Sequence, residues 1–195
     1  MKTKLAVAVV GVLPSLTALC QGTVVYDQQS YSGLPSNDQL APITSGQPMG
    51  QSFTPSLSAV GFINLALHGG IDGKAGTVYI DILSGSITGP VLGTSEAVTV
   101  APFAFGVVTF NFDNPVQLTP GITYYFQTVV ESSGGNVTTP LISPSIYAGG
   151  TGFYNGTAVP NADLEFQEGV YVPEPSMWAL LVLGACALWF VRRKT

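Results

Sequence analysis

The middle of this chain is built from short segments in which apolar and polar residues alternate. In residues 76–83 (GTVYIDIL), Val78, Ile80 and Ile82 fall on one face, with Tyr79 and Asp81 on the other. A period of two residues is typical of a β-strand with one buried face. Parallel strands are buried on both faces and read as continuous apolar runs, so the alternation favours antiparallel pairing.

Four further segments repeat this alternation, at residues 62–68 (FINLALH), 107–113 (VVTFNFD), 122–128 (ITYYFQT) and 162–167 (ADLEFQ). The residues predicted to face inward are Ile63, Leu65, Leu67, Val108, Phe110, Phe112, Ile122, Tyr124, Phe126, Leu164 and Phe166. Glycine- and proline-rich turn signals separate the segments: HGGIDGKAG, SGSITGP, DNP, LTPG and SSGG. We expect an all-β fold over residues 23–171, an antiparallel β-sandwich or jelly roll.

Charged residues are few in this middle part, and almost all of them are acidic. Lys74 is its only basic residue, and with ten acidic residues it gives a formal charge of −9. A surface with one cation cannot neutralise a phosphate backbone, which argues against nucleic acid as a partner. A plain soluble acidic surface is the ordinary interpretation, and if the surface binds a ligand, neutral sugars or divalent cations suit it better.

Residues 1–22 have the form of a secretory signal peptide. Two lysines near the start precede an apolar stretch from Leu5 to about Leu19, followed by small or polar residues. Cleavage after Cys20 or after Gly22 fits the small residues there. Acylation of Cys20, as in a lipoprotein, is the alternative, and the bulk of Leu19 argues against it. The other cysteine, Cys186, lies near the far end, so a domain without both ends holds no thiol.

A second hydrophobic segment lies near the end of the sequence, at residues 177–191. Residues 177–191 carry no charge, and as a helix they rise about 22 Å, against a hydrocarbon core of about 30 Å. They predict a short single transmembrane helix with Trp178 and Trp189 near the two interfaces. The basic tail at residues 192–195 then orients the domain outside the cytoplasm by the positive-inside rule. A permanent tail anchor is one interpretation.

The order of these C-terminal parts resembles the PEP-CTERM sorting signal of Gram-negative bacteria. Pro173, Glu174 and Pro175 match its signature triplet within the motif at residues 172–176, and Arg192 and Arg193 match its basic end. The resemblance implies an exosortase as partner, cleavage near the triplet, and delivery to the cell surface or extracellular matrix. The two prolines also remove backbone donors and disfavour helix, which keeps the segment accessible to a protease.

The strand order also resembles, more loosely, a β-sandwich of exported bacterial proteins, some of which bind carbohydrate. The recurring pieces are QSFTP, TVYIDIL, VTFNFDNPVQLTPGITYYF and YAGGTGFYNG. A likeness of fold implies no particular activity.

Few residues of the middle could support catalysis. His68 is the only histidine of the chain, too little for a zinc site, and we expect it at a strand end on the surface. Asp163 and Glu165, two apart on one predicted strand, would lie about 7 Å apart on its exposed face. That spacing suits a glycan hydrolase, but solvation is the ordinary role of such a pair.

Two kinds of binding site remain as hypotheses. Calcium prefers oxygen ligands, and Asp38, Asp72, Asp113 and Asp163 lie in or beside predicted turns, although no consecutive calcium loop occurs. Carbohydrate binding would use exposed aromatic rings, for which Tyr125, Tyr147, Phe153 and Tyr154 are the candidates.

We therefore expect an exported, non-enzymatic surface or matrix protein without a cofactor, membrane-anchored until an exosortase processes its tail. Recognition of exopolysaccharide, with or without calcium, is the alternative, and a small glycan hydrolase is the third.

Overall fold

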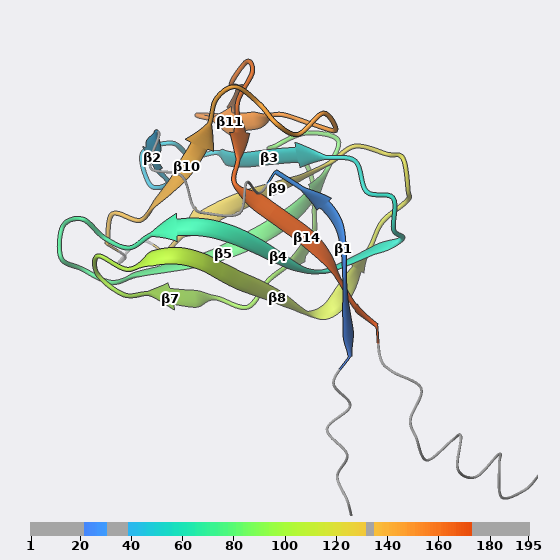
Figure 1. Ribbon diagram of the computed structural model, residues 1–195, viewed down its shortest axis with the longest axis horizontal. Coiled ribbons are helices and arrows are strands. Elements are labelled where there is room, and N and C mark those ends of the chain that lie inside the picture. Colours follow the sequence, from blue (N-terminus) through green and yellow to red (C-terminus); the bar gives the residue numbers. More distant parts are fainter. Residues whose placement is uncertain (1–21, 31–38, 132–134, 173–195) are drawn as a thin grey trace, which may run out of the picture. The chain divides into compact units, whose positions relative to one another are not determined.

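The computed structural model describes residues 22–30, 39–131 and 135–172. These residues form strands and turns without any helix, and the strands pair into two antiparallel sheets (Figure 1). The all-β antiparallel expectation is therefore confirmed. The described part of the chain contains no helix with the length and hydrophobicity that crossing a bilayer requires. The predicted signal peptide, the helix at 177–191 and the basic tail lie outside the described residues.

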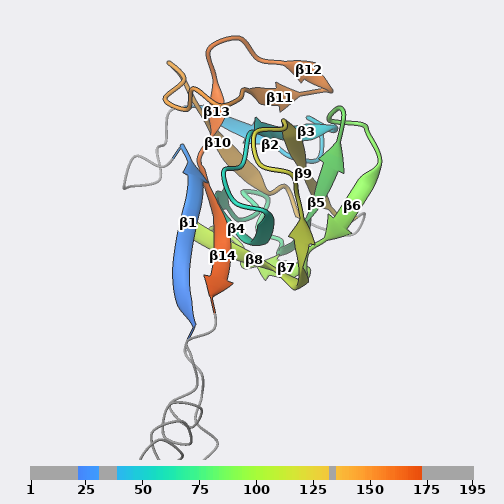
Figure 2. The ribbon, with the colours of Figure 1, turned by 90° about the vertical axis from the view of Figure 1, so that its right-hand side faces the viewer.

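The centre of the first sheet is a run of four antiparallel strands. In spatial order they are β1 (Thr23–Gln29), β14 (Phe166–Val172), β4 (Ala59–His68) and β8 (Phe105–Gln117). At the His68 end of β4 the sheet continues through β10 (Thr138–Ile142), which also pairs with β2 (Leu40–Pro42) and β13 (Asp163–Leu164). The first and last strands of the domain are thus neighbours, and Figure 2 shows β1 and β14 side by side.

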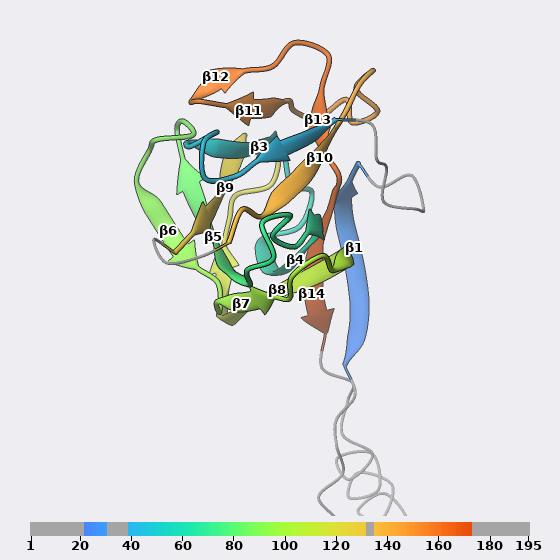
Figure 3. The same ribbon diagram turned by 90° about the vertical axis from the view of Figure 1, so that its left-hand side faces the viewer.

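The second sheet contains the remaining strands. In spatial order they are β12 (Thr157–Ala158), β11 (Gly152–Tyr154), β3 (Met49–Phe53), β9 (Tyr124–Val130), β5 (Gly76–Ser84) and β6 (Val91–Thr94), with β7 (Val98–Val100) also pairing with β5. Figure 3 shows β5 and β6 on the opposite side of the domain from β1 and β14.

The core lies between the inner faces of the two sheets. Ile63 and Leu65 of the first sheet belong to the same buried cluster as Ile80 and Phe126 of the second, and none of these four side chains is exposed. Two sheets packed in this way bury the apolar half of each alternating strand. This face-to-face packing has the form of a β-sandwich.

Three details of the predicted strands are wrong. Ile122 was expected to face inward, but it precedes β9 and is 53% exposed. Residues 113–115 (DNP) were expected to form a turn, but they lie within β8, where the ladder with β4 is interrupted between Asn111 and Val116, so Pro115 takes no part in the pairing. Residues 162–167 were expected to form one strand, but Glu165 separates β13 from β14.

Candidate functional site

The outer face of the first sheet carries an organised set of polar and aromatic side chains. Ile63, Leu65 and Phe166 point into the core, so their alternating neighbours Asn64 and Gln167 point away from it. We call this surface the amide face and define it by Tyr26, Gln29, Asn64, Thr109, Gln167 and Tyr171. These six residues come from the four strands β1, β14, β4 and β8.

A row of hydrogen-bonded side chains crosses all four strands of the amide face. Gln167 Nε2 donates to Gln29 Oε1 at 3.1 Å, and Asn64 Nδ2 donates to Gln167 Oε1 at 3.5 Å. Thr109 Oγ1 donates to Asn64 Oδ1 at 2.8 Å. The backbone register places the same four residues opposite one another. Each amide group has two N–H donors, so the exposed Gln29 and the half-buried Gln167 keep hydrogen-bonding capacity for a ligand, whereas the buried Asn64 links them to Thr109.

Aromatic side chains form a second row beside the amides. The ring of Phe62 is buried between Tyr26, at 5.7 Å and an angle of 84°, and Tyr171, at 4.9 Å and 43°. Tyr171 also donates its hydroxyl proton to Asn111 Oδ1 at 3.1 Å, which fixes the orientation of its ring. Tyr26 and Tyr171 remain 52% and 47% exposed. Two tyrosine rings therefore stand at the surface in positions set by neighbouring side chains.

A third aromatic contact lies at the other end of β4. The rings of His68 and Phe105 are 3.8 Å apart between centroids, and Phe105 is 44% exposed. His68 ends β4, as predicted, and burial lowers the pKa of its imidazole, so the ring is neutral near pH 7. His68 lies six positions after Phe62, which corresponds to about 20 Å along the strand.

Asp163 occupies a different environment from the one expected. Its side chain is completely buried, and its carboxylate accepts four hydrogen bonds. The donors are Gln51 Nε2 at 2.9 Å, Ser145 Oγ at 2.6 Å, and the backbone N–H groups of Ile146 and Tyr147, both at 2.9 Å. Protein donors therefore hold this charge, and Asp163 fixes the 145–147 loop against β3 and β13.

This burial also corrects the predicted position of the acidic pair Asp163 and Glu165. Glu165 is also completely buried, so the expectation that Asp163 and Glu165 lie on an exposed face is wrong. Leu164 and Phe166 are buried as well, which shows that both sides of this segment are covered. A substrate cannot reach either carboxyl group without displacing packed side chains.

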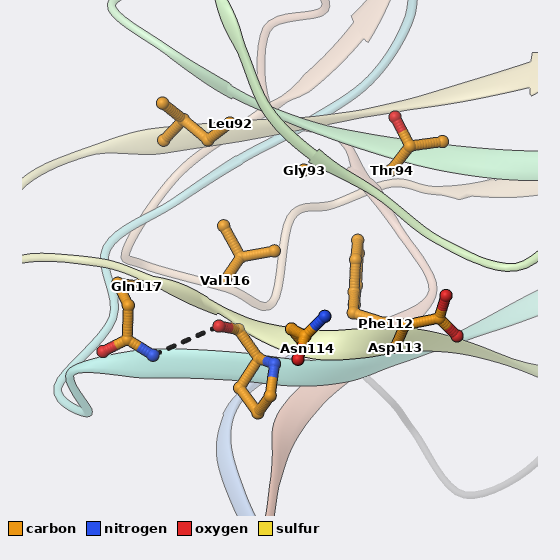
Figure 4. A pocket seen from close by; sticks show the side chains of 9 residues that line it. Leu92, Gly93, Thr94, Phe112, Asp113, Asn114, Val116 and Gln117 are labelled. Carbon is orange, nitrogen blue, oxygen red and sulfur yellow. Dashed lines mark hydrogen bonds between the residues drawn. The ribbon is translucent and has the colours of Figure 1, made fainter.

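The other calcium candidates do not converge. Asp72 lies in the turn after β4, where its Oδ1 accepts the N–H groups of Lys74 and Asn136, both at 3.3 Å. Asp113 lies on β8 beside an open groove of about 550 Å³ between β6 and β8 (Figure 4). In that groove Leu92, Phe112 and Val116 supply the apolar lining.

No group of three or more metal-ligating side chains occurs within residues 22–30, 39–131 and 135–172. The remaining candidate, Asp38, lies outside these residues, as do the sorting-signal residues Pro173, Glu174, Pro175, Arg192 and Arg193.

The predicted sugar-binding tyrosines lie apart from the amide face. Tyr125 is half-buried in β9 and packs edge-on against Phe153 at 5.6 Å. Tyr154 is half-buried beside the core and lines a small apolar pocket with Leu40 and Leu141. Tyr147 is only 8% exposed, and its hydroxyl accepts the Thr54 N–H and donates to Gln28 Oε1, both at 3.1 Å.

Sequence reasoning missed every residue of the amide face. The signal was nevertheless present, because residues 23–29 (TVVYDQQ) and 166–172 (FQEGVYV) place a tyrosine and a glutamine in each terminal strand. What the sequence lacked was the pairing of these two strands, which brings them together. Comparison with known protein families and with curated proteins found no match for this chain.

Proposed function

We propose that this chain is an exported, non-enzymatic protein of the cell surface or extracellular matrix. The observation that carries the proposal is the tail, in which the Pro173-Glu174-Pro175 triplet, the apolar residues 177–191 and the basic residues 192–195 follow one another in the order of a PEP-CTERM signal. In this proposal residues 1–22 direct export, the apolar tail holds the domain outside the cytoplasm, and an exosortase then cleaves near the triplet.

The strand pairing supports such a route. Thr23 lies opposite Val172 in the β1–β14 ladder, so the chain enters and leaves the domain at one place. Only residues 173–176 separate the end of β14 from the predicted span, and four residues reach about 14 Å at most. Before cleavage the triplet would stay within that short reach of both the folded domain and the start of the span, close to a protease embedded there.

The intact mass of the protein isolated from its own cells tests this proposal. Processing predicts a mass that lacks the N-terminal segment and also the residues beyond the Pro-Glu-Pro triplet. A mature chain that still ends in Arg193, Lys194 and Thr195 would support a permanent tail anchor instead. A Glu174→Ala variant that accumulates uncleaved would link processing to the triplet.

Carbohydrate recognition is the second candidate function, and the amide face is the observation that favours it. Sugars present hydroxyl groups around their rim and C–H groups on their faces, so they are bound by amides together with aromatic rings. Co-sedimentation of the purified protein with the exopolysaccharide of its own cells tests this function, since a structural protein without a lectin role would stay in the supernatant.

A further inference from the structure

The amide face carries no ionised side chain, although the domain as a whole is strongly acidic. Its defining residues are tyrosines, amides and a threonine, and His68 at its far end is neutral near pH 7. An anionic polysaccharide would find no cation on this face, and a metal ion would find no carboxylate. The face is therefore chemically matched to an uncharged ligand with many hydroxyl groups.

The spacing of its two rows also matches a sugar chain. Adjacent outward residues of one strand lie about 7 Å apart, which is the distance between the Phe62 row and the Asn64 row. The rows cross four strands, a width of about 14 Å. A sugar ring stacked on Tyr26 would therefore place its hydroxyl rim toward the amides of Gln29 and Gln167 in the neighbouring row. Tyr171, two residues beyond Gly169 on β14, would contact a sugar unit one row farther from the amides.

We propose that the amide face of β1, β14, β4 and β8 binds a linear, neutral glycan, with Tyr26 and Tyr171 as stacking platforms and the Gln29–Gln167–Asn64–Thr109 row as its hydrogen-bonding partner. This inference rests on the second candidate function and gives it a site and a ligand class. The contacts within the face support it further, because the Tyr171–Asn111 hydrogen bond and the Phe62 ring hold both platforms in place before any ligand arrives. Such preorganisation reduces the entropy lost on binding.

Titration calorimetry of the full chain with neutral hexasaccharides tests the inference directly. The probes are the β-1,4-glucan, β-1,3-glucan and β-1,4-mannan hexamers, and the detergent must lack a sugar head group that would compete. We expect saturable binding of at least one hexamer. The Tyr26→Leu and Tyr171→Leu variants keep an apolar cover over Phe62 but lose the flat ring, so each should weaken binding about tenfold, equivalent to about 1.4 kcal/mol.

Two further variants separate lost recognition from lost folding. Thr109→Val removes only the hydroxyl group that donates to Asn64 and preserves the shape of an exposed side chain, so it should weaken binding while thermal unfolding changes little. Tyr79→Leu removes a half-buried tyrosine from β5 in the other sheet and should leave the dissociation constant unchanged.

Three other results would contradict the proposal that the amide face binds a neutral linear glycan. Loss of hexamer binding in Tyr125→Leu, with Tyr26→Leu and Tyr171→Leu unaffected, would move the site to the other sheet and leave the lectin function standing. Co-sedimentation with the native polysaccharide without binding of any hexamer would likewise keep the function and overturn a neutral linear ligand. Self-association that Tyr171→Leu abolishes, without sugar binding, would make the face an interface between two copies.

Discussion

Asp27 and Gln28 of β1 together lie opposite the single residue Glu168 of β14. The ladder pairs Tyr26 with Gly169 and Gln29 with Gln167, so two residues of one strand face one residue of the other in a β-bulge. Asp27 accepts the backbone N–H groups of Ser56 at 2.7 Å and Leu57 at 2.8 Å, and the Ser56 hydroxyl also donates to it. Glu168 is completely buried, and among the described residues neither of its oxygens makes a hydrogen bond of good geometry, although the Asp27 side chain and the Gln28 backbone lie close enough to affect its pKa.

This arrangement gives the two carboxyl groups opposite titration behaviour. Burial and, after it, the negative charge of Asp27 raise the pKa of Glu168 to about 8. Burial would also raise the pKa of Asp27, but the hydrogen bonds from Ser56 and Leu57 outweigh it and lower that pKa below its ordinary value. Near pH 7 the pair therefore holds one negative charge, on Asp27.

We predict that the protein loses stability as the pH rises from about 4.5 to about 8. The unfolded chain releases the Glu168 proton near pH 4.5, whereas the folded chain retains it up to about pH 8. Since the folded state binds up to one more proton in this window, its stability falls by about 1.4 kcal/mol per pH unit. Asp27 acts at lower pH, where its contribution is present above the ordinary aspartate pKa and is lost as the pH falls through the lowered one.

Thermal unfolding of Glu168→Gln between pH 5 and pH 9 measures this contribution. Glutamine keeps the shape of the side chain and cannot ionise, so the melting temperature of the variant should vary less with pH, and its advantage over the parent should grow toward pH 9. Glu131→Gln removes an exposed carboxyl group from the residue that follows β9 and controls for the change in net charge. Parallel pH profiles for the parent and Glu168→Gln would contradict the prediction.

Asp163→Asn should destabilise the fold by about 3 kcal/mol. Gln51 Nε2 donates to one carboxylate oxygen, and the Ser145 hydroxyl and the Ile146 and Tyr147 N–H groups donate to the other. The single N–H₂ group of asparagine must replace one of these two oxygens, which leaves the buried donors on that side without an acceptor. Urea denaturation followed by circular dichroism measures the loss. Asp113→Asn, on an exposed part of β8, is the matched control and should change the midpoint little. An equally stable Asp163→Asn protein would show that the second acceptor oxygen of the carboxylate adds nothing to stability.

Tyr147→Phe should loosen one specific contact of the first strand. The Tyr147 hydroxyl bridges Thr54 N–H and Gln28 Oε1, so its removal leaves the Thr54 amide without an acceptor at a cost of about 1 kcal/mol. We expect the Thr54 amide to exchange its hydrogen faster in this variant. The Ser56 and Leu57 amides, which bond to Asp27, provide the internal control and should stay protected. Unchanged exchange at Thr54 would show that the hydroxyl does not hold this turn.

Local alternation was sufficient to predict most of the core. Val78, Ile80 and Ile82 are completely buried in β5, as are Ile63, Leu65 and Leu67 in β4, because one face of each strand meets the opposite sheet. The same alternation could not predict whether the residues that point away from the core are exposed or buried. Asn64 and Ala66 alternate with the inward residues of β4, yet they too are buried, in a central strand that has neighbours on both sides.

The candidate site depended on contacts between distant parts of the chain. Gln29 and Gln167 are 138 residues apart in sequence, and only the pairing of the first strand with the last brings their side chains together. The position of Asp163 required the fold of the 145–147 loop, whose N–H groups no sequence pattern directs at a particular carboxylate. The calcium candidates were therefore selected for the turn residues next to them in sequence. In the folded protein the environment of Asp163 is set instead by hydrogen-bond donors from other segments.

Phe103→Gly should make the protein more stable, although it removes a large side chain. Residues 101–104 form a turn closed by the Ala104 N–H donating to Ala101 O at 3.2 Å, with Pro102 and Phe103 at its centre. Phe103 adopts a φ of 56°, the left-handed conformation that this position of a type II turn requires and that glycine or asparagine ordinarily supplies. Its ring is 71% exposed, so little buried area is lost with it.

The left-handed conformation costs a residue with a β-carbon about 1–2 kcal/mol, which glycine avoids. Glycine loses more chain entropy on folding, and this offsets about 0.5–1 kcal/mol of the gain. The free energy of unfolding should therefore rise by up to about 1 kcal/mol in Phe103→Gly. Phe103→Ala also removes the ring but keeps the β-carbon, so it should give no such gain. A glycine variant that unfolds at lower urea concentration than the alanine variant would show that the ring, which rests against Gly73, stabilises this turn more than its backbone strain destabilises it.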